Sequence, residues 1–211
     1  MIILSLQNNR ARHTKGFTLV ELLVAVALFS ILMAIAAGGF VRALRSEREV
    51  SAMMAAESNV NLALEQMARE MRTGYLFCHD PGVPSPNEAC ASCSVVALGA
   101  TQVWTCPTIE FYNASGEKVD YSLDANNVLE RADSAENSGL PEPLTSDNIS
   151  VTDLNFTIFG NVEGDTWNPR VTVAIGVQPN DNTVTWSTAN LETTISARSI
   201  DCIPGSSPAQ C

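Results

Sequence analysis

The sequence predicts an α+β fold, in which one long N-terminal helix packs on a β-rich globular head of mainly antiparallel strands. Two patterns predict it. A helical pattern, first apolar and then amphipathic, occupies residues 17–73, and short β-like runs separated by Gly, Asn and Asp follow from residue 74 onwards. Roughly 135 residues after the helix suffice to bury one core. We therefore expect a single head, at residues 74–211, and not two domains.

The first half of the helix, residues 17–41, has the length and composition of a membrane span. Its only ionisable side chain is Glu21. The stretch would form about 37 Å of α-helix, which is enough to cross a hydrocarbon core of about 30 Å. It is too long for the apolar part of a cleaved secretory signal, and no Ala-x-Ala-like site follows it. We expect a single-pass anchor whose buried carboxylate needs a partner.

The second half of the helix, residues 42–73, is predicted to be amphipathic. It contains neither Pro nor Gly, and strong helix formers dominate it. Its larger apolar residues recur at spacings of seven, four, three and four, whereas charged residues such as Glu65 and Arg69 lie off this stripe. Gly74 is the expected stop. The stripe is expected to cover the core of the head, with a coiled-coil seam as the alternative, and consists of Met53, Val60, Leu64, Met67 and Met71.

The head is predicted to contain two groups of short strands. The first group comprises residues 94–98, 101–105, 108–112, 118–123 and 127–131, and the second comprises 150–159, 170–178, 183–187 and 191–200. Residues 132–148, rich in Pro, Ser and acidic side chains, are expected to be loop. Antiparallel strands with one face on the helix are indicated by alternating apolar positions, namely Val151, Leu154, Phe156, Ile158, Val171, Val173, Ile175 and Val177.

The distribution of the cysteines predicts the orientation of the chain in the membrane. Basic residues do not, because Arg10, Arg12 and Lys15 before the span are matched by Arg42, Arg45 and Arg48 after it. An even number of cysteines confined to one side of a span indicates disulfides in an oxidising compartment. We therefore place the N-terminus in the cytoplasm and the head outside. The six disulfide candidates are Cys78, Cys90, Cys93, Cys106, Cys202 and Cys211.

The pairing of these cysteines stays open. Residues 78–93 are rich in Pro and Gly and contain three cysteines, so a cross-linked loop is expected within a Cys-rich region at 78–106. The four cysteines of this region allow three pairings, and Cys202 and Cys211 are expected to close a small C-terminal loop. A zinc site and free redox-active thiols are the alternatives, but the irregular spacings disfavour zinc. We predict no metal.

Net charge bears on the partners. The chain carries −11, and without its first 16 residues it has 9 basic and 23 acidic residues, a net charge of −14. Such a surface repels phosphate groups, so no nucleic-acid partner is expected. No catalytic group is found either: His13 lies before the apolar stretch, and no nucleophile–base pair can be assembled around His79. We therefore predict that the chain is not an enzyme.

The segment Gly16-Phe-Thr-Leu-Val-Glu21 follows Lys15 and opens the apolar run. A basic residue, Gly, an aromatic residue, a small polar residue, two aliphatic residues and an acid, in that order, resemble the N-terminus of the type IV prepilin family, pilins and type II secretion pseudopilins alike. The motif covers under a tenth of the chain. The resemblance implies a leader peptide at residues 1–16, cleavage by a prepilin peptidase between Gly16 and Phe17, and N-methylation of Phe17.

The resemblance also implies partners. Glu21 corresponds to the acid that is thought to neutralise the terminal amine of an adjacent subunit during assembly. The expected partners are other major and minor pseudopilins, the prepilin peptidase and the inner-membrane assembly platform. The expected location is the bacterial inner membrane, with the head in the periplasm or at the cell exterior. Some members of the family bind calcium, and the turns at 124–127 and 180–182 would be the places, but neither matches a recognised calcium loop. We expect no cofactor.

The head is more specifically similar to J-type minor pseudopilins and PilW-like minor pilins. The similarity rests on 63–72 at the end of the helix, Ile109-Glu-Phe-Tyr112, Val128-Leu-Glu-Arg131 and residues 191–198. One departure is Gly38-Gly39, where major pilins often carry a proline midway along the helix. The resemblance implies a minor pseudopilin at or near the filament tip that initiates assembly and supports secretion. A minor type IV pilin for adhesion, motility or DNA uptake is the close alternative, and an anchored receptor that never assembles is the rival from another class.

Overall fold

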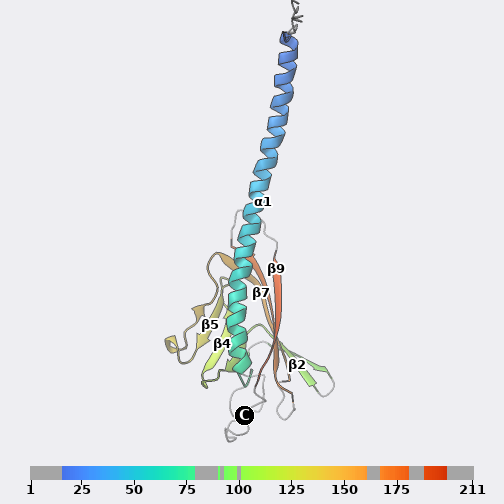
Figure 1. Cartoon of the computed structure of the whole chain (residues 1–211). Coiled ribbons are helices and arrows are strands. Elements are labelled where there is room, and N and C mark those ends of the chain that lie inside the picture. Colours follow the sequence, from blue (N-terminus) through green and yellow to red (C-terminus); the bar gives the residue numbers. More distant parts are fainter. Residues whose placement is uncertain are drawn as a thin grey trace, which may run out of the picture. The chain divides into compact units, whose positions relative to one another are not determined.

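The computed structural model describes residues 16–78, 90, 93–98, 101–160, 167–180 and 188–198. The chain divides into two compact units, Met1–Arg48 and Glu49–Cys211, which we call the N-terminal unit and the head unit. The first element, helix α1, extends from Leu19 to Thr73 and contributes to both (Figure 1). The head unit adds nine strands and one short 3₁₀ helix to it among the described residues. The predicted α+β class is thereby confirmed.

In the N-terminal unit, α1 is exposed on every side and, apart from Glu21, is largely apolar up to Val41. It is the helix that is long and apolar enough to cross a membrane, by length and composition, among the described residues. Large side chains such as Leu22, Phe29 and Ile35 are more than half exposed. A helix that is apolar all round is stable in lipid and not in water. The helix continues through Gly38 and Gly39 without a break, so this unit fits a single-pass anchor.

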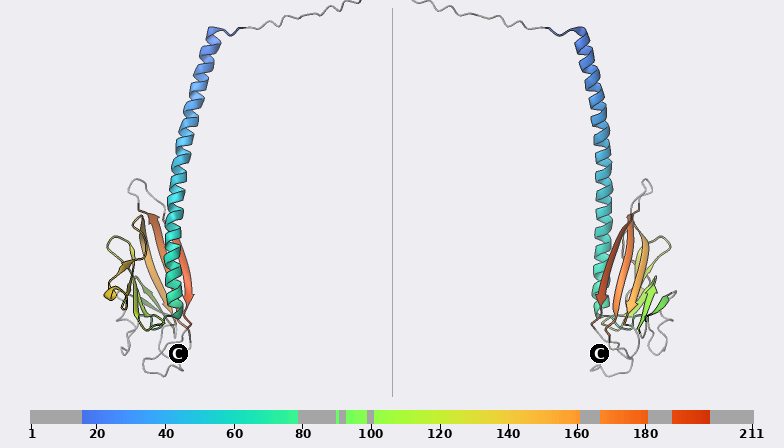
Figure 2. Two further views of the ribbon diagram at one scale, coloured as in Figure 1. Left: turned by 60° about the vertical axis from the view of Figure 1, so that its left-hand side comes forward. Right: turned by 90° about the vertical axis from the view of Figure 1, so that its right-hand side faces the viewer.

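In the head unit, the remainder of α1 is amphipathic, as predicted. Val60, Leu64, Met67 and Met71 are buried, and Met53 is half-buried. Two small residues, Ala56 and Ala63, complete the buried stripe. Figure 2 shows this part of α1 running alongside strand β9 (Ala189–Ser196) in both views. The stripe therefore covers the core of the head, which is the expected role.

The helix ends where a glycine allows a close approach. Gly74 follows Thr73, and a Cβ at this position would lie 2.6 Å from Cδ2 of Phe111. The chain then pairs with strand β3 (Ile109–Tyr112): the Tyr75 and Tyr112 backbones exchange hydrogen bonds, and the Cys78 N–H donates to the Glu110 carbonyl at 2.7 Å. The packing of Phe111 against this turn accounts for the glycine that the sequence places there.

The larger sheet has five antiparallel strands in the order β1-β2-β7-β8-β9. Strands β1 and β2 form a hairpin, and β7 lies between β2 and β8 although it comes after the smaller sheet in the sequence. The bounds are Ser94–Leu98 for β1, Thr101–Cys106 for β2, Ile149–Phe159 for β7 and Arg170–Pro179 for β8.

A β-bulge explains why the apolar positions of β7 do not alternate strictly. Val151 pairs with Val177, but Asp153 pairs with Gly176, so Thr152 is the extra residue. One inserted residue shifts the period-2 pattern by one position. Val151 and Leu154 therefore both point into the core although they are three residues apart, and the alternation continues through Phe156 and Ile158.

The smaller sheet has four antiparallel strands in the order β3-β4-β5-β6 and is a meander. Its remaining strands are β4 (Lys118–Leu123), β5 (Leu129–Asp133) and β6 (Glu142–Pro143). The 3₁₀ helix η1 (Asn137–Gly139) connects β5 to β6. Both sheets and the helix contribute to one buried cluster, in which the largest fully buried side chains are Tyr121, Phe77, Phe111 and Phe156.

Three strand expectations need correction. Residues 132–148 are not all loop, because they contain the end of β5, η1 and β6. The Pro and acidic residues of this segment argue against a strand. However, β6 is a two-residue, exposed edge strand, and Pro is tolerated in an edge strand. The first β group also shifts: β3 begins at Ile109, and β5 is Leu129–Asp133, because 124–128 forms a turn. The last predicted strand ends at Ser196, and residues 183–187 lie outside the described residues.

Candidate functional site

The predicted cleavage site lies in an exposed stretch just before the helix. Gly16, Phe17 and Thr18 have no regular secondary structure, and α1 begins at Leu19. Phe17 is 81 % exposed. A Cβ on Gly16 would contact no atom within 4 Å, so nothing in the described fold requires glycine at this position. The Gly16–Phe17 peptide bond is thus accessible to a protease without any unwinding of α1.

The helix begins with a cap that sequence reasoning missed. The Thr18 hydroxyl oxygen accepts a hydrogen bond from the Glu21 N–H at 3.3 Å, and the Thr18 carbonyl accepts one from the Leu22 N–H at 3.2 Å. The pattern Thr-x-x-Glu is that of a capping box, in which Thr is the N-cap and Glu occupies the third helical position. Thr18 therefore fixes the start of α1 two residues after the predicted cleavage site.

Glu21 lies in the first turn of α1 and is exposed. The partial positive charge at a helix N-terminus favours a carboxylate there. Among the described residues Glu21 makes no ion pair, and its neighbours along the helix are aliphatic. The structure thus leaves the carboxylate available to a cation from another molecule. The leader residues Arg10, Arg12 and Lys15, and also His13, lie outside the described residues.

Comparisons with known proteins bear on this segment. A family model, the prokaryotic N-terminal methylation motif, matches residues 11–37. The match includes the predicted cleavage site, Glu21 and most of the apolar stretch. No curated protein matches the chain, and no solved structure matches it. The motif supports a type IV pilin or pseudopilin, which implies processing by prepilin peptidase and assembly with other pilins.

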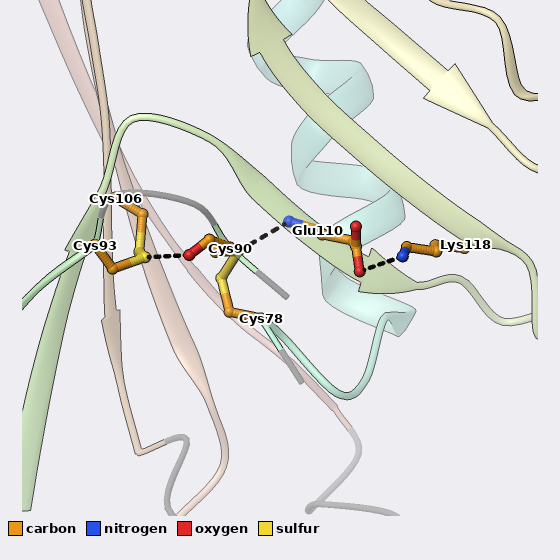
Figure 3. The surroundings of a disulfide bond; sticks show 6 residues. All are labelled: Cys78, Cys90, Cys93, Cys106, Glu110 and Lys118. Atoms are coloured by element: carbon orange, nitrogen blue, oxygen red, sulfur yellow. Dashed lines mark hydrogen bonds and ion pairs between the residues drawn. A yellow bond between two sulfur atoms is a disulfide. The ribbon is translucent and has the colours of Figure 1, made fainter. Parts of the chain in front are cut away.

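Four cysteines meet where the two sheets come together (Figure 3). Disulfides join Cys78 to Cys90 and Cys93 to Cys106, and no cysteine in the described part of the chain is free. All four Sγ atoms lie within 4.8 Å of one another. The structure thus selects one of the three pairings that the sequence left open. Cys202 and Cys211 lie outside the described residues.

The cysteine cluster contacts strands of both sheets. Cys106 ends β2 of the larger sheet, whereas Cys78 follows the helix and hydrogen-bonds to Glu110 of β3 in the smaller sheet. The backbone N–H of Glu110 also donates to the Cys90 sulfur at 3.4 Å, and the Glu110 carboxylate pairs with Lys118 at 2.7 Å. With both disulfides formed, the described sulfurs are not thiolates that could bind a metal. The expectation of no metal stays a prediction.

The structure also contains a charged network that the sequence did not predict. The Arg131 guanidinium on β5 contacts Glu70 of α1, Asp133 of β5 and Glu136 beyond it, at 2.6–3.1 Å. The Tyr121 hydroxyl of β4 donates to the Glu70 carboxylate at 2.5 Å. The Asp133 side chain is only 3 % exposed. This network fixes the end of α1 on the smaller sheet.

Burial and the hydrogen bond to Glu70 raise the pKa of Tyr121. In the unfolded chain a tyrosine ionises near pH 10. Above this pH the folded state therefore binds more protons than the unfolded state, and its stability falls as the pH rises. We expect Tyr121→Phe to reduce this slope by up to about 1.4 kcal/mol per pH unit above pH 10. Urea unfolding between pH 9 and 11 measures it, and an unchanged slope would contradict the assignment.

Two further features, the turn at 124–127 and the tryptophan side chains, have ordinary structural surroundings. The Asp124 carboxylate accepts hydrogen bonds from the backbone N–H groups of Val128 and Asn126, which lower the pKa of Asp124. These hydrogen bonds account for an aspartate at the start of this turn, and the expectation of no cofactor stays a prediction. Trp104 is buried, whereas Trp167 is 51 % exposed and lies against Phe159 and Arg170. His79, Trp186 and residues 181–182 lie outside the described residues.

Proposed function

We propose that this chain is a structural subunit without catalytic activity, a minor pseudopilin of a type II secretion pseudopilus. A prepilin peptidase cuts it between Gly16 and Phe17, and Phe17 is N-methylated. The head lies on the outer side of the inner membrane, and the subunit joins the filament at or near its tip, where it initiates assembly and supports secretion. The observation that carries the proposal is the matched segment 11–37, with an exposed scissile bond directly before a capped helix.

The chemistry of the new N-terminus explains why Glu21 is needed. Cleavage creates an α-amino group two residues before α1, at the positive end of the helix dipole, where a cation is unfavourable. A carboxylate at membrane depth is also unfavourable, by about 2.5–3.5 kcal/mol on insertion scales. Pairing the amine of one subunit with Glu21 of its neighbour offsets both costs. Assembly in the membrane is therefore favoured over the isolated subunit.

The first test is mass spectrometry of the native protein extracted from its membrane. The polypeptide is expected to begin at Phe17 and to carry one added methyl group. A chain that retains its first sixteen residues would overturn the proposal and leave a tethered ectodomain.

The second test replaces Glu21. We expect Glu21→Ala to reduce cross-linking to partner subunits at least tenfold, because the counter-charge of the neighbouring amine is lost. Membrane insertion and head folding are expected to be unchanged, because Glu21 is not part of the head unit.

Glu47→Ala is the matched control, since Glu47 is an exposed acid of the same helix beyond the apolar stretch. It is expected to cross-link as the wild type does. Unchanged cross-linking of the Glu21 variant would contradict assembly through this carboxylate. The partner captured by cross-linking also separates a pseudopilus from the alternative, a type IV pilus with its own major pilin.

A further inference from the structure

Three arginines follow the apolar stretch on one side of α1. Arg42, Arg45 and Arg48 are spaced three residues apart, so successive side chains are rotated by about 60° and all three lie within a third of the helix circumference. All three are exposed. The first of them directly follows Val41, the last residue of the apolar stretch.

These arginines have no acidic partner in the described part of the chain. The ion pairs of the described residues all involve residues of the head unit, and none includes Arg42, Arg45 or Arg48. Glu47 points away from the arginines around the helix. Glu49 lies on the same side, four residues after Arg45, but among the described residues the structure shows no ion pair between the two. The cluster is therefore a concentration of positive charge in a chain whose net charge is −11.

The cluster has the dimensions of a lipid headgroup layer. From Arg42 to Arg48 the helix rises about 9 Å, and the polar layer on each side of a bilayer is about 5–8 Å thick. The 23 residues from Leu19, where α1 begins, to Val41 form about 35 Å of helix, so this stretch ends at or just beyond a hydrocarbon core of about 30 Å. The arginines thus begin where lipid phosphates are found. A guanidinium binds a phosphate through two parallel hydrogen bonds.

We propose that Arg42, Arg45 and Arg48 form a binding surface for the phosphate groups of anionic lipids, on the leaflet that faces the head. The surface fixes the depth and rotation of α1 in the bilayer. The inference rests on the membrane anchor and not on assembly into a filament.

The test compares lipid selectivity among variants of the full chain. In every variant the leader cations Arg10, Arg12 and Lys15 are replaced by Gln, so that the leader does not contribute. Each protein is placed in nanodiscs of equal amounts of phosphatidylglycerol and phosphatidylcholine, and native mass spectrometry counts the lipids retained. One basic residue near an anionic surface changes lipid partition about fivefold, so three should favour phosphatidylglycerol by about 100-fold.

The variant Arg42→Gln/Arg45→Gln/Arg48→Gln is expected to retain both lipids about equally. The matched control is Arg69→Gln/Arg72→Gln/Arg198→Gln, which loses the same charge from exposed positions of the head unit. It should keep the selectivity of the parent within about twofold. Selectivity should fall as salt rises from 0.05 to 0.5 M, because salt screens exposed charges.

Two results would overturn the proposal: a parent protein without preference for phosphatidylglycerol, or an equal loss of preference in the control variant. Displacement of the lipid by millimolar inorganic phosphate would also overturn it, because the arginines would then bind free anions. Every variant should remain in the nanodisc, and loss of the protein from the disc would contradict the membrane anchor itself.

Discussion

Replacing Arg131 by Ala is expected to lower the free energy of unfolding of the head unit by about 3 kcal/mol. The side chain is 14 % exposed and contacts Glu70, Asp133 and Glu136. Its removal leaves the buried Asp133 carboxylate and the half-buried Glu70 carboxylate without a counter-charge. Removing one partner of a buried ion pair typically destabilises the folded state by about 3–5 kcal/mol. We take the lower end because Glu70 and Glu136 keep some contact with water.

Arg69→Ala is the matched control for this substitution. Arg69 also pairs with a glutamate, Glu65, but its side chain is 76 % exposed, and exposed pairs four residues apart on a helix contribute about 0.3–0.5 kcal/mol. Thermal unfolding in detergent, followed by tryptophan fluorescence, should show a decrease in Tm of about 6–12 °C for Arg131→Ala and under about 2 °C for Arg69→Ala. Equal shifts would mean that the network does not hold the helix on the sheet.

The second large effect concerns the disulfides. Each bond closes a short loop, with sequence separations of 12 and 13 residues. A loop of this size restricts the unfolded chain by about 3 kcal/mol. We therefore expect Cys78→Ala/Cys90→Ala and Cys93→Ala/Cys106→Ala each to lower the free energy of unfolding by about 3 kcal/mol. Because the two loops follow one another without overlap, the four-fold variant should lose about 6 kcal/mol.

Urea unfolding of the three variants measures these values, with Ser94→Ala as the control for an exposed side chain beside the cluster. Thiol titration of the oxidised wild-type protein should find no reactive cysteine. Several reactive thiols, or a paired substitution without effect on stability, would contradict the pairing. A loss in the four-fold variant well beyond the sum would show that the native contacts among the sulfurs add stability of their own.

Much of the fold was predictable because its signals are local. The spacing of Val60, Leu64, Met67 and Met71 predicts the buried face of α1, and alternation predicts most of β7 and β8. The sequence could not show Ala56 and Ala63 as core residues, since alanine is common on both faces of a helix. The bulge at Thr152 was likewise missed, although the three-residue step from Val151 to Leu154 was a usable signal.

In the candidate site, too, features that are local in the sequence were predictable, and features that depend on the packing of distant segments were not. Gly16, Phe17 and Glu21 are adjacent in the sequence, so their arrangement was readable, and so was the overlooked cap at Thr18. The disulfide pairing was not readable, because spacing alone does not distinguish three connectivities. Glu70 and Arg131 are 61 residues apart, and each looks like an ordinary exposed charge in its own element. Only the packing of α1 on the smaller sheet brings them together.

The position of β7 between β2 and β8 has a consequence for how the nascent chain folds during export. Strands β3 to β6 pair with strands that are adjacent in the sequence, whereas β2 can complete its pairing only after β7 is available. Long-range pairing of this kind is slow to form. In the proposed topology, with the N-terminus in the cytoplasm, the residues that follow the apolar stretch of α1 cross the membrane first, so both disulfides can form once residue 106 has crossed. The bond between Cys93 and Cys106 then closes the β1–β2 hairpin covalently while its partner strand β7 is still on the other side of the membrane.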